Sequence, residues 1–143
     1  MVGCGAARPG TLHVLLQSQC HLIRNTPAAP AVARRYVREA LAGQPDGVVD
    51  TATLIVSELA TNCVRHAHTD LAVTIERTNG QLHVDIADAG TGQVTPRHPE
   101  PTEVTGRGLR IVEELSDAWG VREHADGEGK SVWFELSLAE KRF

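Results

Sequence analysis

Hydrophobic and polar positions alternate most regularly in the segment LAVTIERTNGQLHVDIAD, residues 71–88. Two apolar runs with a period of two flank the dipeptide Asn79-Gly80, and a period of two is typical of a strand with one buried face. The runs consist of Leu71, Val73 and Ile75, followed by Leu82, Val84 and Ile86. Asn-Gly is the preferred dipeptide of type I′ hairpin turns. The segment therefore predicts a β-hairpin with one apolar face.

A helical period appears twice before this hairpin and once after it. The first helix is expected around residues 31–43 and should stop at Gly43, since glycine commonly ends helices. A second helix is expected from about Val48 to His66, and a third over residues 108–120. The apolar faces of the first and third helices are formed by Val32, Tyr36, Val37 and Leu41, and by Leu109, Val112, Leu115 and Trp119.

The remaining segments complete a fold of the α+β class. Residues 12–23 resemble an edge strand, and residues 121–138 resemble a second hairpin around the turn DGEG. Residues 89–107 carry Pro and Gly without an apolar period, which predicts a long functional loop. The element order predicts a two-layer sandwich: a mixed, mostly antiparallel sheet with three helices on one face. We expect residues 1–24 to form an N-terminal segment with a possible edge strand, and residues 25–143 to form the domain.

Composition narrows the class of protein and of partner. A chain of 143 residues has the length of one domain. Its formal net charge of −4 gives no support for direct nucleic-acid or anionic-membrane binding. No run approaches the ~20 apolar residues of a membrane span, and the N-terminus lacks a secretory signal pattern. Three cysteines without CxxC spacing argue against a disulfide framework, so a cytoplasmic location is expected.

A polar stripe interrupts the predicted second helix at SELATNCVRHA, residues 57–67. Glu58, Asn62 and His66 are spaced four apart, and residues four apart lie on one helix face. This stripe runs beside an apolar line that ends at Cys63. Taken alone, such a stripe is more often a solvated helix edge than a site.

Two glycine motifs follow later in the chain. DAGTG, residues 88–92, comes directly after a predicted buried strand; its Asp accepts hydrogen bonds, and its glycines allow close backbone approach to a ligand. GRGL, residues 106–109, opens the predicted third helix, where free N–H groups and the helix dipole favour a phosphate. Each motif alone is weak, because strand ends and helix starts often carry these residues. A Walker A reading of DGEGKS (126–131) fails, because its glycines are too close together and a strand follows.

The three motifs, in this order and with a long loop before the last, resemble the GHKL ATPase superfamily. That superfamily includes gyrase, the heat-shock chaperone, histidine kinases and mismatch-repair ATPases. SELATNCVRHA is similar to its N-box, DAGTG to its first glycine box and GRGL to its second. KSVWFEL (130–136) is similar to the closing strand beside the adenine. The resemblance covers about residues 30–138 and is closest to small bacterial anti-sigma-factor serine kinases, which implies a Bergerat-type ATP-binding fold.

The resemblance implies ATP and Mg²⁺ as ligands and assigns a role to each matching residue. Glu58 would be the catalytic base, and Asn62 would bind ATP and ligate Mg²⁺ through its side-chain oxygen, which suits a hard cation. Asp88 would accept a hydrogen bond from the adenine amino group. The further ATP-binding candidates are His66, Gly90, Gly92, Gly106, Arg107, Gly108, Leu109 and Ser131. A core-facing imidazole at His66 and a solvent-facing side chain at Arg107 stay as alternatives.

The function implied is that of a serine/threonine protein kinase. It would phosphorylate an anti-anti-sigma domain and otherwise sequester a sigma factor, with a possible homodimer and a lid at residues 91–105 ordered by ATP. A nucleotide-gated protein-binding module with little or no turnover is the first alternative. An ordinary α+β domain whose glycines are only turns is the second.

Overall fold

The computed structural model describes residues 15–66, 69–88, 107–123 and 130–138. Its elements, in chain order, are β1 (Leu15–Ile23), α1 (Ala29–Ala40), α2 (Asp46–His66), β2 (Leu71–Thr78), β3 (Gln81–Asp88), α3 (Arg107–Leu115), β4 (Ala118–Glu123) and β5 (Lys130–Ser137). This order confirms the predicted succession of strands and helices. No helix in these ranges is long and apolar enough to cross a membrane.

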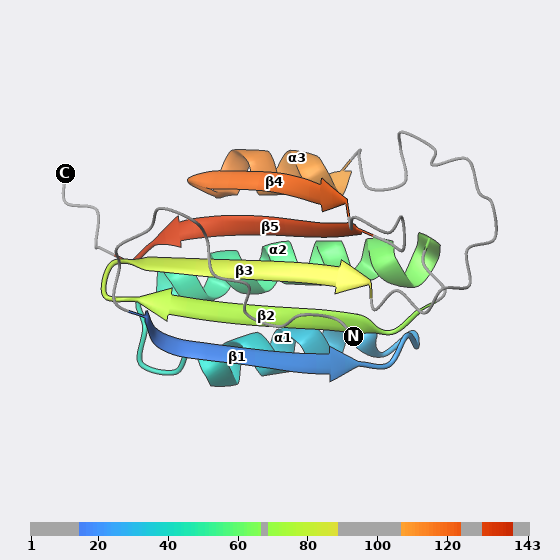
Figure 1. Cartoon of the computed structure of the whole chain (residues 1–143), viewed down its shortest axis with the longest axis horizontal. Coiled ribbons are helices and arrows are strands. Elements are labelled where there is room, and N and C mark those ends of the chain that lie inside the picture. The colour runs from blue at the N-terminus through green and yellow to red at the C-terminus, as the bar shows by residue number, and fades with distance from the viewer. Residues whose placement is uncertain (1–14, 67–68, 89–106, 124–129, 139–143) are drawn as a thin grey trace.

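The strands form one sheet in the order β1-β2-β3-β5-β4. The helices lie together on one face of this sheet, and the other face turns away from them (Figure 1). The predicted α+β sandwich is therefore confirmed. Every pairing of the described strands is antiparallel, so the parallel component of the expected mixed sheet does not occur among them.

A continuous apolar core joins the helices to the sheet. On the sheet side, Ile75, Val84 and Phe134 lie opposite one another on β2, β3 and β5, and all three are fully buried. On α2, the buried apolar positions follow the helical period and are Ala52, Ile55, Val56, Leu59 and Ala60. Each large buried side chain contributes about 1.5–3 kcal/mol. This packing fixes the rotation of α2 and leaves Glu58 and Asn62 partly buried beside the core.

The β2–β3 hairpin is confirmed, but its predicted turn type is wrong. A type I′ turn needs a positive φ at both central residues, and among the described residues only Gly43 has one, at 90°. The Thr78 hydroxyl closes the turn instead. It accepts hydrogen bonds from the backbone N–H groups of Gly80 (3.4 Å) and Gln81 (3.1 Å). A side-chain hydroxyl thus supplies the local bonds that a left-handed turn was expected to supply.

The third helix ends earlier than predicted, and Trp119 belongs to β4. After Leu115, the Ser116 hydroxyl donates to the carbonyl of Val112, which competes with continued helix. The backbone N–H of Asp117 then donates to the Glu135 carbonyl of β5 at 2.9 Å. These bonds direct the chain into the sheet, where Trp119 lies opposite a residue of β5.

The cysteines also differ from expectation. Cys20 of β1 is disulfide-bonded, while Cys63 of α2 is a free thiol. The expectation rested on an odd cysteine count and on missing CxxC spacing. Neither property excludes a single disulfide bond.

Candidate functional site

The site lies at one end of the sandwich, on the right in Figure 1, where α2 and β3 end and where α3 and β5 begin. This arrangement follows from the antiparallel pairing of β3 with β5, in which Ala87 lies opposite Ser131. The last residue of β3, Asp88, therefore meets the first residue of β5, Lys130. The backbone N–H of Lys130 donates a long hydrogen bond, 3.4 Å, to Oδ2 of Asp88. A carboxylate has about four acceptor positions, so Asp88 can accept more than one hydrogen bond.

Cys63 links α2 to Asp88. Burial raises the pKa of the Cys63 thiol to about 12; the Asp88 carboxylate adds to the rise, and Lys130 opposes it. Because charge interactions weaken with distance, the thiol, the carboxylate and the ammonium group belong to one neighbourhood. The thiol stays protonated near neutral pH and adds no charge of its own. Cys63 of α2 and Asp88 of β3 thus lie in one neighbourhood, and Asn62 precedes Cys63 on α2.

Asn62 carries an unpaired polar atom at this site. Its side-chain nitrogen, Nδ2, is buried and has no hydrogen-bond partner among the described residues. An unpaired buried donor costs about 1–3 kcal/mol, and a ligand oxygen placed beside it removes that cost. The donor therefore fits a phosphate oxygen. The oxygen of the same amide is of the type that Mg²⁺ prefers, so the residues present fit a magnesium–nucleotide complex.

Glu58 lies one turn before Asn62 on α2 and is also partly buried. The preceding residue, Ser57, connects α2 to α1 and also accepts a bond within the helix. Ser57 accepts a hydrogen bond from Nη1 of Arg34 on α1 at 2.7 Å, and its carbonyl accepts one from the Thr61 hydroxyl at 2.8 Å. A carboxylate on a helix held in this way keeps a defined position relative to Asn62.

Ser131 and Asp88 lie on different faces of the sheet. Successive side chains of a strand point to opposite faces, and Val132 and Phe134 of β5 belong to the helix-side core. Ser131 therefore faces away from the helices, whereas Lys130 shares the side of Asp88. Sequence reasoning missed Lys130, although its even spacing from the apolar positions of β5 was a signal for its face.

The other predicted ligands fall partly outside the described residues. Gly90, Gly92, Gly106 and the expected lid at residues 91–105 lie outside them entirely. For four further candidates only the backbone is described, and these are His66, Arg107, Gly108 and Leu109. The backbone of α3 begins at Arg107, as the motif GRGL predicted.

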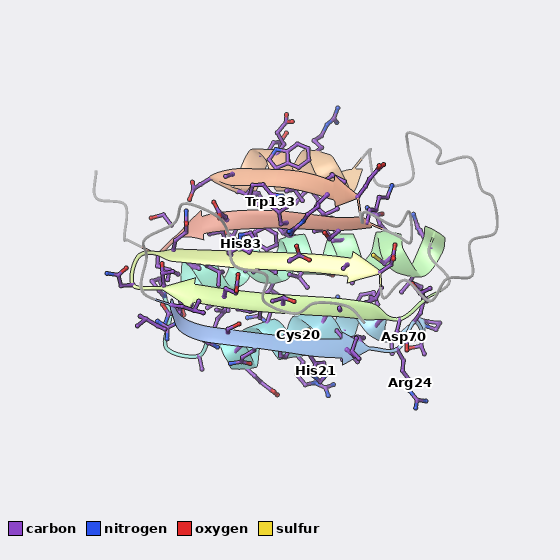
Figure 2. The ribbon with its side chains drawn as sticks, viewed as in Figure 1. Cys20, His21, Arg24, Asp70, His83 and Trp133 are labelled. Carbon is purple, nitrogen blue, oxygen red and sulfur yellow. The ribbon has the colours of Figure 1, made fainter. Side chains whose placement is uncertain are left out.

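Asn25, which sequence reasoning also missed, holds this end of the sandwich together. Its side-chain nitrogen donates to the carbonyl of Thr69 at 2.9 Å and, more weakly, to that of Cys63 at 3.5 Å. Its backbone N–H donates to Oδ1 of Asp70 at 3.0 Å. Figure 2 shows Arg24 and Asp70 side by side where β1 ends and β2 begins. Asn25 thus connects the end of β1 to the end of α2 by hydrogen bonds. The candidate site includes residues of this end of α2.

Replacing Asn25 with Ala should therefore destabilise the protein. The change leaves two backbone carbonyls without this donor, and we expect the free energy of unfolding to fall by about 1–3 kcal/mol. Urea denaturation measures the effect. Asn79→Ala, the same change at an exposed turn, should shift stability by no more than about 0.5 kcal/mol. Equal stability of the two variants would contradict the role given to Asn25.

Comparison with known proteins places the fold in a family. The family model for the histidine kinase-like ATPase domain matches residues 23–136. The chain therefore belongs to the histidine kinase-like ATPase domain family, and the resemblance inferred from its three motifs is confirmed. Membership in this family implies a nucleotide ligand.

A solved structure has the same fold. It contains the RsbU and RsbW domains of Rv1364c from Mycobacterium tuberculosis, with a TM-score of 0.67 and 18% sequence identity. The match covers 89% of this chain and 34% of that chain, so this chain spans about a third of that protein's solved length. No curated protein matches the chain.

Proposed function

We propose that the chain is an ATP-binding serine/threonine protein kinase of the anti-sigma-factor type. It would phosphorylate an anti-anti-sigma domain and bind a sigma factor as the competing partner. The observation that carries the proposal is the unpaired buried donor of Asn62 on α2, directly beside Cys63, whose pKa the Asp88 carboxylate raises. The proposal also rests on the similarity to an RsbW domain that is joined to a second domain in one chain.

The adenine end of the proposed site is formed around Asp88. Its carboxylate accepts a hydrogen bond from the exocyclic amino group of adenine. Guanine carries an oxygen at that position, so a guanine base would set one acceptor against another, and a polar mismatch of this kind discriminates strongly. The protonated Cys63 thiol adds no second negative charge beside the base. The site thus favours ATP over GTP.

The phosphate end of the proposed site is formed along α2. Bound Mg²⁺ would neutralise phosphate charge beside this end of α2. The Asn62 amide would supply an oxygen ligand to it without adding negative charge beside the triphosphate. Glu58, about 6 Å away along the helix axis, accepts the proton of the attacking hydroxyl. A partner's Ser or Thr oxygen then bonds to the γ-phosphorus, the bond to the bridging oxygen breaks, and ADP leaves.

A protein acceptor suits this site better than water. Phosphoryl transfer depends mainly on positioning and on charge stabilisation. A docked loop of a partner brings its hydroxyl in line with the γ-phosphate, whereas a water molecule must be held by the site alone. We therefore assign the hydroxyl to a second protein, and an anti-anti-sigma domain is the proposed class.

Titration calorimetry with ATP tests the nucleotide part of the proposal. We expect the unmutated chain to bind ATP with an affinity that rises when Mg²⁺ is added. Asn62→Ala should remove about tenfold or more of the magnesium-dependent affinity, which corresponds to about 1.4 kcal/mol, and should change affinity in EDTA much less. Asn79→Ala, at the opposite end of the hairpin, is the matched control and should bind as the unmutated chain does. Failure of the unmutated chain to bind magnesium–ATP would overturn the proposed function.

A further inference from the structure

Lys130, the first residue of β5, carries a positive charge beside Asp88. Successive side chains of a strand point to opposite faces, and Val132 and Phe134 belong to the core that the helices cover. Lys130 therefore points to the helix side of the sheet, as Asp88 does at the end of β3. The bond of 3.4 Å from the Lys130 N–H to Oδ2 of Asp88 keeps the two residues adjacent. Burial and Asp88 raise the pKa of the Cys63 thiol and Lys130 lowers it, so the ammonium group also lies within charge–charge range of α2.

The fold does not use this ammonium group in an ion pair. Glu123 of β4 lies opposite Lys130 in the strand pairing, on the same face of the sheet. Within the described ranges, however, no ion pair includes Lys130. The Lys130 side chain is partly buried, and its head group has three N–H donors and no acceptor. The ligand group that fits beside it is therefore a hydrogen-bond acceptor.

The edge of adenine that carries the amino group offers such an acceptor. Next to this amino group, which donates, adenine has the unprotonated ring nitrogen N1, which accepts. Guanine has the reverse order at the same two positions: a carbonyl oxygen followed by an N–H. Asp88 and Lys130 present an acceptor followed by a donor, so the pair matches adenine at both positions and guanine at neither. The phosphates of ATP also accept hydrogen bonds, but they lie across the ribose from this edge of the base.

We propose that the Lys130 ammonium group donates a hydrogen bond to N1 of adenine and determines base specificity together with Asp88. This role rests on the proposed function, in which Asp88 accepts from the adenine amino group. It gives Lys130 the place at the base that sequence reasoning gave to Ser131, which points to the other face of the sheet. Lys130 is a specificity-determining residue and not a catalytic one, since the γ-phosphate reacts at Glu58.

Titration calorimetry with ATP and with 1-deaza-ATP, in which a C–H group replaces N1, tests this contact. We expect the unmutated chain to bind ATP about tenfold or more tightly than 1-deaza-ATP, because the lost hydrogen bond has a charged donor. Lys130→Met keeps the apolar stem and removes the donor. It should weaken ATP binding by about the same factor and bind the two nucleotides within about twofold of each other. Removing the ligand atom and the side chain separately and together isolates the contact between them.

Arg122→Met is the matched control for the loss of a positive charge. Arg122 lies opposite Ser131 at the same end of the sheet, but on the other face, where it bonds Asp85. This control should keep the preference for ATP over 1-deaza-ATP, and circular dichroism confirms that both variants are folded.

Three results would overturn the role of Lys130 while the nucleotide site stood. The unmutated chain could bind ATP and 1-deaza-ATP equally well. Lys130→Met could weaken both nucleotides by the same factor, as loss of a phosphate contact would. Arg122→Met could abolish the preference for ATP over 1-deaza-ATP, which would make that preference a general effect of charge. An unmutated chain that binds neither nucleotide would overturn the proposed function together with this contact.

Discussion

Asp88→Asn should weaken ATP binding by about 5- to 150-fold, equivalent to about 1–3 kcal/mol. The substitution keeps the size of the side chain but replaces one acceptor oxygen with a donor. At the proposed position this donor faces the amino group of adenine, which is also a donor. The backbone N–H of Lys130, which donates to Oδ2 of Asp88, adds a second donor that the amide satisfies less well. Titration calorimetry at fixed magnesium concentration measures the loss.

Asp85→Asn is the matched control for this prediction. Asp85 is on the same strand but accepts a hydrogen bond from Arg122, on the sheet face that points away from the helices. Its substitution should leave the dissociation constant for ATP within about twofold. GTP supplies a second comparison, because Asp88→Asn should narrow the preference for ATP over GTP. Equal losses of ATP affinity in the two variants, or an unchanged preference for ATP over GTP in Asp88→Asn, would show that Asp88 does not bind the adenine base.

The sequence predicted those parts of the fold that depend on local periodicity. The hairpin at residues 71–88 and the 21-residue helix α2 have strong periods of two and 3.6, and both were located correctly. Trp119 fits the helical period of the preceding segment, and its assignment to a helix was wrong. The bond from the Asp117 N–H to β5 decides that assignment. This contact joins residues far apart in sequence, so no local pattern contains it.

The candidate site was predictable only in part, for the same reason. The spacing of Glu58 and Asn62 on one helix could be read from the sequence, because four-residue spacing is local. The neighbourhood of Cys63, Asp88 and Lys130 depends instead on how α2, β3 and β5 meet. Spacing along a strand predicts the face of each side chain, and by that rule Lys130 rather than Ser131 lies on the side of Asp88.

The role of Asn25 had no signal in the sequence. Its bonds reach Cys63, Thr69 and Asp70, which are 38 to 45 residues away along the chain. An Asn before a Thr-Pro pair is typical of a turn, and this explains its position at the end of β1. Its bonds to the end of α2 arise only once β1, α2 and β2 have packed together.

Glu58→Gln should separate binding from chemistry. The substitution preserves the shape of the side chain and removes its ability to accept a proton at neutral pH. Loss of a general base typically lowers a rate by 10²- to 10⁴-fold. We therefore expect phosphoryl transfer from labelled ATP to an anti-anti-sigma domain to fall by about that factor, while the dissociation constant for ATP stays within about twofold. The label should appear on a Ser or Thr of the partner.

Glu39→Gln provides the control for the Glu58 experiment, since Glu39 is exposed on α1 and should transfer phosphate at the unmutated rate. If Glu58→Gln weakened ATP binding as much as it slowed transfer, its assignment as the base would be wrong, because a base acts in the transition state rather than in the bound ground state. If the unmutated chain bound ATP and a partner tightly but labelled no candidate, the kinase proposal would fail while the nucleotide site stood. The chain would then act as a nucleotide-gated binding module, in which Glu58 and Asn62 hold magnesium–ATP without turnover.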